Sequence, residues 1–329
     1  MRKGVGVARR LIGAGTAAVA GAALALLQGC GLLTEPAYVS ALTWSPDGYV
    51  YFKRDVDGGA GEVWRVRQGG RVEPFLRNFE DPCEGGPAYV NVVRAFGEGG
   101  LAVGFECLTS ADRIYVVDLR TRAMSLLLGA DDIRDATLDA SGMRGYVAQE
   151  NGRCASVAGF SDGALRDLDV RVPSMSGEWR LSAAYGAGQR GSKNEGCAAA
   201  GKAVSPVLTA DGRSVVMLVT TARAGGGLNQ SLADSYDWQV GFLDGDADTV
   251  RMVGPVLKSV PRLAVSPDGT KVALERNGPT DGLLVMDVAS GETQSVVADK
   301  RATDPAFSPD GRTIAYCSDL TSIKFVQVS

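Results

Sequence analysis

Residues 304–317 read DPAFSPDGRTIAYC, which is a short apolar stretch, the turn sequence Ser308–Gly311 and a second apolar stretch. Two identical and two looser copies of the turn occupy Ser45–Gly48, Ser266–Gly269, Thr209–Gly212 and Asp139–Gly142. Pro presets φ for a tight turn, Asp hydrogen-bonds the local backbone, and Gly accepts the left-handed conformation that returns the chain antiparallel. A turn repeated between apolar stretches predicts an array of β-hairpins.

Each predicted hairpin is followed by further strand-like runs. Third runs lie at Glu62–Arg67, Arg113–Leu119, Trp238–Leu243, Leu283–Val288 and Ile323–Val328, and fourth runs at Val72–Leu76, Ala123–Leu128, Val250–Val253 and Thr293–Val297. Four antiparallel strands per repeat form the blade of a β-propeller. We therefore expect an all-β, six-bladed propeller of four-stranded antiparallel blades. The blades should begin near Tyr38, Ala88, Ile133, Val204, Pro261 and Thr303.

The repeat resembles the TolB-type propeller repeat. The pattern is Pro-x-(Trp/Phe)-Ser-Pro-Asp-Gly, then an Ile-Ala-Tyr strand as in Thr313–Cys317, then an Ile-Tyr-Val-x-Asp strand as in Arg113–Leu119. The resemblance covers most of residues 36–329, although the second repeat has Gly97–Gly100 in place of the turn motif. It implies the propeller fold. TolB-like propellers serve as binding platforms, as sensor halves of peptidases, or as lyases, so the resemblance leaves the function open.

The last repeat raises the question of how the ring closes. It ends at Ser329 after three strands, so its outer strand is either missing or supplied by Glu35–Ser40. A terminal strand used in this way removes an exposed sheet edge. A seventh blade would need strands within Pro173–Lys202, but that segment is rich in Gly, Ala and Ser and lacks a β pattern. Six blades are therefore expected.

The first 29 residues predict an export signal. Basic residues at positions 2, 3, 9 and 10 precede an uncharged apolar stretch from Leu11 to Leu27. The sequence Leu27-Gln-Gly-Cys30 resembles a bacterial lipobox, so we expect cleavage before Cys30 and acylation of that residue. This gives a lipoprotein signal peptide at 1–29, a lipid-anchored tether at 30–36 and the propeller at 37–329. An ordinary secretory signal and an uncleaved anchor helix are the alternatives.

A lipidated Cys30 places the mature protein on the extracytoplasmic side of a membrane, as a periplasmic or cell-surface lipoprotein. Either the inner or the outer membrane is compatible with these residues. So is either the general or the twin-arginine export route, the latter hinted at by Arg9-Arg10.

The six cysteines fit an oxidising compartment. Cys83 precedes the first strand of the second blade and Cys107 ends its second strand, so the two should be neighbours. Cys154 and Cys197 flank the long insertion on one face. We therefore predict the disulfides Cys83–Cys107 and Cys154–Cys197, with Cys317 left over.

Charge and composition exclude several classes of function. The signal segment holds four of the 34 Lys and Arg residues and none of the 38 Asp and Glu residues, which leaves the mature chain at 30 against 38, or −8. An acidic domain without a basic stripe argues against nucleic acid as a partner. The chain has no His, and it lacks a Gly-x-Ser-x-Gly elbow, so the His-based triads and His zinc sites are absent. We expect no catalytic residue and no enzyme activity.

Two acidic loops have the residue types that bind calcium. Asp55, Asp57 and Glu62 lie in one inter-strand loop, and Asp244, Asp246 and Asp248 lie in another. A calcium loop of the EF type needs an acidic residue at its twelfth position, where these loops have Val66 and Pro255. We read both as solvated turns and expect no metal and no cofactor.

Loop lengths indicate where a partner would bind. First-to-second and third-to-fourth turns emerge on one face of a propeller and are tight here. The longer connections emerge on the other face, at Asn78–Pro87, near Arg153, and at Pro173–Lys202, Ala222–Asp237 and Asn277–Asp281. The aromatic and basic candidates for partner contact on that face are Trp179, Tyr185, Arg190, Lys193, Tyr236 and Trp238.

These observations favour a monomeric, non-enzymatic lipoprotein that binds a protein or cell-envelope partner through its loop-bearing face. One alternative is a carbohydrate or small-ligand binder that uses the central channel. The other is a His-free hydrolase or lyase with two carboxylates about 5–10 Å apart in the channel.

Overall fold

The Ser-Pro-Asp-Gly copies at Ser266–Gly269 and Ser308–Gly311 close their β-hairpins by the same set of hydrogen bonds, and the copy at Ser45–Gly48 shares all of them except those of the Ser hydroxyl. In the copy at Ser266–Gly269, the Gly269 N–H donates to the Ser266 carbonyl at 2.8 Å, and Gly269 has a φ of 71°. Asp268 Oδ1 accepts the Ser266 hydroxyl at 2.6 Å and the Thr270 N–H at 3.1 Å. The turn is thus specified by side chains within five residues, which explains why its sequence alone predicts the hairpin.

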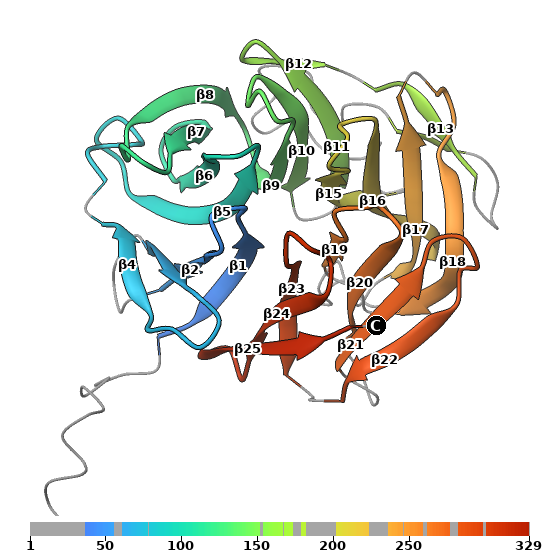
Figure 1. Ribbon diagram of the computed structural model, residues 1–329. Helices are drawn as coiled ribbons and strands as arrows, with labels where there is room; N and C mark the ends of the chain where they lie inside the picture. Colours follow the sequence, from blue (N-terminus) through green and yellow to red (C-terminus); the bar gives the residue numbers. More distant parts are fainter. Residues whose placement is uncertain are drawn as a thin grey trace, which may run out of the picture. The chain divides into compact units, whose positions relative to one another are not determined.

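The computed structural model describes residues 37–329 except 56–60, 78, 152–153, 167, 174–178, 182–201, 224–235, 246, 259–261, 277–281, 299–300 and 329. In this part of the chain the strands form six antiparallel blades that follow one another around a centre (Figure 1). The predicted six-bladed propeller is therefore confirmed.

Five blades have four strands. Blade 1 comprises β1 (Val39–Trp44), β2 (Val50–Arg54), β3 (Glu62–Val66) and β4 (Glu73–Leu76). Blade 2 comprises β5 (Ala88–Phe96), β6 (Gly100–Cys107), β7 (Asp112–Asp118) and β8 (Met124–Ala130). Blade 3 comprises β9 (Ile133–Leu138), β10 (Arg144–Asn151), β11 (Cys154–Ser161) and β12 (Ala164–Arg166). Blade 4 comprises β15 (Ala203–Leu208), β16 (Ser214–Arg223), β17 (Tyr236–Asp244) and β18 (Arg251–Lys258). Blade 5 comprises β19 (Leu263–Val265), β20 (Lys271–Arg276), β21 (Gly282–Asp287) and β22 (Thr293–Val297).

Blade 6 has three strands among the described residues, namely β23 (Ala302–Phe307), β24 (Thr313–Ser318) and β25 (Ser322–Gln327). Residues 39 and 40 do not supply its outer strand, because Val39 and Ser40 belong to β1 and pair with Arg54 and Lys53 of β2. The insertion after blade 3 holds a short hairpin, β13 (Val170–Val172) with β14 (Trp179–Leu181), and no seventh blade among the residues that can be described.

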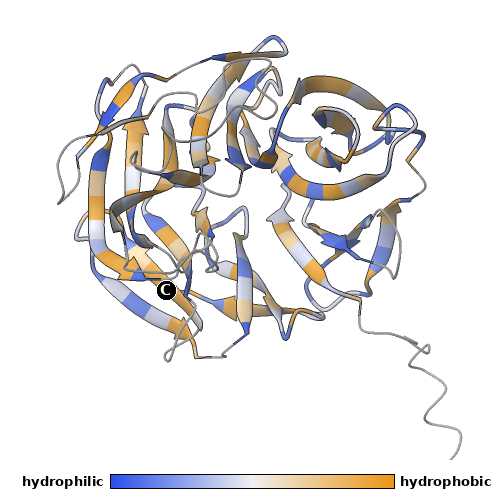
Figure 2. Ribbon diagram, turned by 180° about the vertical axis from the view of Figure 1, so that it is seen from behind, coloured by the Kyte–Doolittle hydropathy of each residue, from blue (hydrophilic) through white to orange (hydrophobic). Residues whose placement is uncertain are grey.

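The core consists of apolar layers between neighbouring blades, one layer for each of the six junctions. Figure 2 shows the corresponding alternation of apolar and polar residues along the strands. The layer that closes the ring packs Leu42, Val50 and Phe52 of blade 1 against Ala315 and Cys317 of blade 6. Apolar packing therefore closes the ring where a shared fourth strand is not seen in the described residues.

The inner strands of neighbouring blades are also joined by side-chain hydrogen bonds to backbone. The Thr43 hydroxyl accepts the Ala95 N–H at 3.0 Å, which links blades 1 and 2. In the same way the Thr137 hydroxyl accepts the Leu208 N–H at 3.0 Å, which links blades 3 and 4. These bonds fix the positions of the inner strands around the centre.

The predicted disulfide between Cys83 and Cys107 is formed, and both residues are buried. It fixes the connection between blades 1 and 2 to the end of β6. Cys317 is a free, buried thiol, and burial raises its pKa to about 12. The Cys154 side chain and Cys197 lie outside the described residues, so their pairing stays a prediction.

Within the described part of the chain, no helix has the length and apolar character needed to span a membrane. The predicted signal, Cys30 and the tether lie outside the described residues.

Candidate functional site: the central channel

A cavity of about 670 Å³, which we call the funnel, lies on the axis, at the face that carries the tight turns. We call this face the turn face and the opposite one the loop face. All six blades contribute to the funnel. The last residue of every inner strand lines it: Trp44, Phe96, Leu138, Leu208, Val265 and Phe307. Because these residues end strands anchored in the apolar layers, the funnel has a rigid apolar ring.

The mouth of the funnel is made by the first turns of the blades. Pro46, Pro267 and Pro309 of the three identical turns line it, as do Ala140 and Ala210 of the two looser turns. Proline offers no backbone N–H and alanine no polar side-chain atom, so these positions are apolar and small. The same turns also contribute polar lining residues, namely Asp139, Ser141, Thr209, Asp211 and Ser266, so the mouth is mixed in polarity. Such a mouth admits an extended peptide or a small molecule without displacing long side chains.

An ion pair lies deeper along the inner strands. Arg94 lines the funnel, and its guanidinium binds Asp135 of the next blade through two bonds, Nε to Oδ1 at 3.2 Å and Nη2 to Oδ2 at 2.8 Å. The exposed fractions of the two side chains are 16% and 9%. A bidentate pair of this kind satisfies both groups and holds blades 2 and 3 together.

Asp304 joins three blades. Its Oδ1 accepts the Ala41 N–H of blade 1 at 3.0 Å and contacts Arg262 Nε, just before blade 5, at 3.1 Å. Its own N–H donates to Glu275 Oε2 of blade 5 at 3.1 Å. The charge of Asp304, more than any other neighbour, raises the pKa of the Arg262 guanidinium. Neither Asp304 nor Glu275 lines the funnel, so this cluster supports the ring rather than a ligand there.

Three inner strands share an unusual backbone feature at this level. Ala41, Ser205 and Asp304 have φ values of 54°, 51° and 50°, and each lies four residues before the first residue of its turn. A register shift between the first two strands of the blade accompanies each of them. These are β-bulges, which re-aim the backbone; in blade 1 the Ala41 N–H thereby reaches Asp304.

Burial raises the pKa of Glu275 to about 8, and the neighbouring charge of Asp304 adds to the effect. The folded protein thus holds a proton that the unfolded chain releases near pH 4.5. This stabilising contribution is present below that pH and is lost as pH rises through about 8. We expect wild-type stability to fall between about pH 4.5 and about pH 8, and the Glu275→Gln variant to lose much of this dependence. Thermal unfolding across this range measures the effect, with the exposed Glu292→Gln as the control. Parallel pH profiles of wild type and Glu275→Gln would contradict this account.

The carboxylates considered for calcium have other partners. Asp55 pairs with Lys53 at 3.0 Å, Asp248 with Arg171 at 2.7 Å, and Asp244 accepts the Ser214 hydroxyl at 2.6 Å. Asp57 and Asp246 lie outside the described residues. Among the side chains that the structure describes, no group of three or more acidic or Cys residues could hold a metal ion.

The predicted contact residues of the loop face have mixed outcomes. Trp238 is not an exposed anchor: its exposed fraction is 1%, and it packs with Leu218 and Leu274 in the layer between blades 4 and 5. The backbones of Trp179 and Tyr236 lie in β14 and β17, but their side chains are outside the described set, as are Tyr185, Arg190 and Lys193 entirely. Apart from Trp238, the loop-face contact residues stay predictions.

Sequence reasoning missed four large exposed side chains on the loop face. Tyr38, Tyr89, Leu108 and Leu320 have exposed fractions of 57%, 42%, 57% and 40%, and they belong to blades 1, 2 and 6.

Sequence reasoning also missed the ion pairs of the inner strands. A usable signal was present, because Asp135, Arg262 and Asp304 all stand four residues before the first residue of a turn, at the same repeat position.

No protein-family model matches the chain, and no curated protein matches it. Solved structures match its fold. TolB from Acinetobacter baumannii has a TM-score of 0.53 and 14% identity over 89% of this chain, and the chain spans 63% of the length of that TolB. A TolB-type protein from Agrobacterium tumefaciens has a TM-score of 0.54 and 16% identity, covering 89% of this chain and 92% of that one.

A third match is an oligogalacturonate lyase from Vibrio parahaemolyticus, with a TM-score of 0.50 and 11% identity, covering 89% of this chain and 91% of that one. Identities this low show the fold and leave the activity undecided. With its six antiparallel blades, its repeated turn and these matches, the protein is a six-bladed β-propeller with a TolB-like fold.

Proposed function

We propose that this protein is a non-enzymatic binding protein of the bacterial cell envelope, anchored through a lipid on Cys30, which holds an extended segment of a protein partner in its axial funnel. The observation that carries the proposal is the funnel of about 670 Å³ to which every blade contributes an inner-strand end. Its walls combine a ring of apolar strand ends and prolines with hydroxyl and carboxylate groups of the turns, and this mixture suits a peptide chain, which has both apolar side chains and a polar backbone.

The ionisable groups near the funnel support binding rather than catalysis. Arg94 and Asp135 are locked in a bidentate pair, and Asp304 is held by Arg262 and by the backbone of blade 1. General acid–base catalysis needs a carboxyl group within hydrogen-bond reach of the substrate. Glu275 and Asp304 are buried away from the funnel, so a substrate there would not meet them. The two carboxylates that do line it, Asp139 and Asp211, accept backbone N–H groups of their own turns, from Ser141 at 3.1 Å and from Arg213 at 3.0 Å.

The loop face provides a second candidate surface for the same role. Its exposed Tyr38, Tyr89, Leu108 and Leu320 are the side chains that a protein contact would cover. The two faces predict different crosslinks, so one experiment distinguishes them.

We expect a photoreactive residue at position 210, in the funnel mouth, to crosslink a defined protein in intact cells. The same residue at position 289 should not. Ala210 and Ala289 are both exposed and both lie in tight turns of the turn face, but only Ala210 lines the funnel. Ala210→Arg should abolish capture of that protein because it fills the mouth with a long charged side chain, whereas Ala289→Arg should leave capture intact. Mass spectrometry identifies the adducts. Crosslinks from position 320 alone would move the contact to the loop face.

A carbohydrate or small metabolite in the same funnel is the rival. It would give no protein adduct at position 210, and it would give a hit on a glycan array that Ala210→Arg removes. Turnover of such a ligand by the wild-type protein would establish an enzyme instead.

A further inference from the structure

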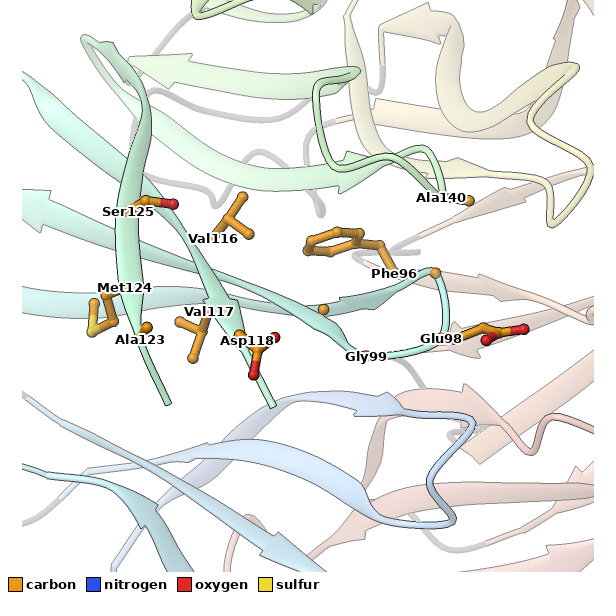
Figure 3. A pocket seen from close by; sticks show the side chains of 12 residues that line it. Phe96, Glu98, Gly99, Val116, Val117, Asp118, Ala123, Met124, Ser125 and Ala140 are labelled. Atoms are coloured by element: carbon orange, nitrogen blue, oxygen red, sulfur yellow. The ribbon is translucent and has the colours of Figure 1, made fainter. Parts of the chain in front are cut away.

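A second cavity, of about 430 Å³, lies beside the funnel on the turn face. It is bounded by the β5–β6 turn and the β7–β8 hairpin of blade 2 and by the first turn of blade 3 (Figure 3). Phe96, Gly97 and Ala140 line both cavities. This side pocket is therefore adjacent to the funnel, with Phe96, Gly97 and Ala140 between them, so a chain that leaves the funnel over these residues would reach it.

The walls of the side pocket are apolar. In Figure 3 the Phe96 ring points toward Val116, and Ala140 faces them from blade 3. The ring is held by glycines: a Cβ on Gly100 would stand 2.2 Å from a ring atom, and one on Gly142 would stand 2.5 Å from another. Because Phe96 packs against bare backbone on two turns, the pocket wall is fixed rather than adaptable.

The charged residues that line the side pocket are both acidic, Glu98 and Asp118, and both are exposed. Asp118 Oδ1 accepts the backbone N–H groups of Thr121 and Arg120, at 2.6 Å and 3.0 Å. These bonds, led by those from Thr121, lower the pKa of Asp118, so the carboxylate is ionised at neutral pH. An apolar cavity with two carboxylates at its rim complements an apolar group that lies next to a cation.

We propose that the side pocket is a specificity site which takes an apolar side chain of the bound partner, with a Lys or Arg beside it in the partner sequence. This inference rests on the proposed function, because it names the chemistry of the segment that the funnel holds. The apolar side chain would contact Phe96 and Val116, and the basic one would lie near Glu98 and Asp118.

The first test needs no partner. The mature protein is labelled on Val and Leu methyl groups, the Val116 signals are assigned with Val116→Ile, and capped dipeptides are titrated. Acetyl-Leu-Lys-amide should shift the Val116 signals saturably, with a dissociation constant of about 1 mM. Acetyl-Leu-Glu-amide should bind several-fold more weakly, and acetyl-Ser-Lys-amide should not bind. The signals of Leu126, which is 54% exposed and does not line the pocket, should not move. Equal shifts with all three peptides, or none at about 10 mM, would overturn the inference.

The second test uses two adjacent positions of β8. Ser125 lines the pocket and Leu126 does not, yet both are exposed. Ser125→Phe should fill the pocket, abolish the Val116 shift and weaken partner capture about tenfold or more, while Leu126→Phe should do neither. If Ala210→Arg abolishes capture and Ser125→Phe does not, the side pocket is wrong and the funnel stands. If Ala210→Arg has no effect, the proposed function fails whatever the dipeptides show.

Discussion

Replacing Asp304 by Ala should lower the free energy of unfolding by about 3 kcal/mol, the lower end of the cost of breaking a buried charge pair, because Arg262 is 34% exposed and water can partly solvate it. The side chain is 8% exposed and serves three blades at once. Its loss leaves the Ala41 N–H without the acceptor that it has now and removes the carboxylate that balances Arg262. The junctions with blades 5 and 1 would both weaken, at the place where the ring must close.

Urea unfolding of the mature chain, followed by Trp fluorescence, measures this loss. Asp310→Ala is the matched control, because Asp310 lies in the adjacent turn, is exposed, and accepts only the local Ser308 hydroxyl and Arg312 N–H. It should cost much less than Asp304→Ala, because water replaces the lost hydrogen bonds of an exposed side chain. Asp304→Asn should fall between the two, since it keeps an acceptor for Ala41 but not the charge for Arg262. Equal losses for Asp304→Ala and Asp310→Ala would show that the network does not close the ring.

The fold could be predicted because its decisive interactions are local. The hydrogen bonds of the turn at Ser308–Gly311 join residues at most five positions apart, and the strands on either side are apolar. The hairpin can therefore be predicted from this stretch of sequence alone. Repetition then gives the blade count. The third and fourth strands followed from the same logic, and the first strands begin within two residues of the predicted positions.

The inner-strand network could not be predicted, because its partners are far apart in sequence. Asp304 and Ala41 are 263 residues apart, and Arg94 and Asp135 are 41 apart. The sequence does not show which neighbouring blade a polar residue of a strand will contact, because that contact depends on how the blades are arranged around the axis. The side pocket depends in part on the same kind of contact, between Phe96 of blade 2 and Gly142 of blade 3.

Trp238 shows how composition misleads at the edge of an insertion. It stands beside a Gly-rich segment, where an aromatic residue resembles a contact anchor. In the structure β17 continues through it, and the strand alternation turns its ring into the layer between blades 4 and 5. An aromatic ring on the inward side of a strand is buried because removing its apolar area from water is favourable. The Gly-rich segment next to it in the sequence does not change this.

Removing the disulfide should have the second large effect on stability. Cys83 and Cys107 are 24 residues apart, and closing a loop of that length in the unfolded chain corresponds to about 3 kcal/mol. We expect the Cys83→Ala/Cys107→Ala variant to lose about that much free energy of unfolding. The bond fixes the connection between blades 1 and 2 beside Phe79, Phe105 and Tyr115, so amide hydrogen exchange should rise first in this connection.

Reductant provides the control. Wild type should lose stability on reduction, and the double variant should lose only what a Cys154–Cys197 bond contributes, so the same pair of measurements tests that second predicted disulfide. A double variant as stable as oxidised wild type would mean that the apolar contacts of Phe79 and Phe105 hold the connection without the bond. Conversely, a loss well above about 3 kcal/mol would mean that the disulfide maintains the layer between blades 1 and 2 in the folded state and does more than limit the unfolded chain.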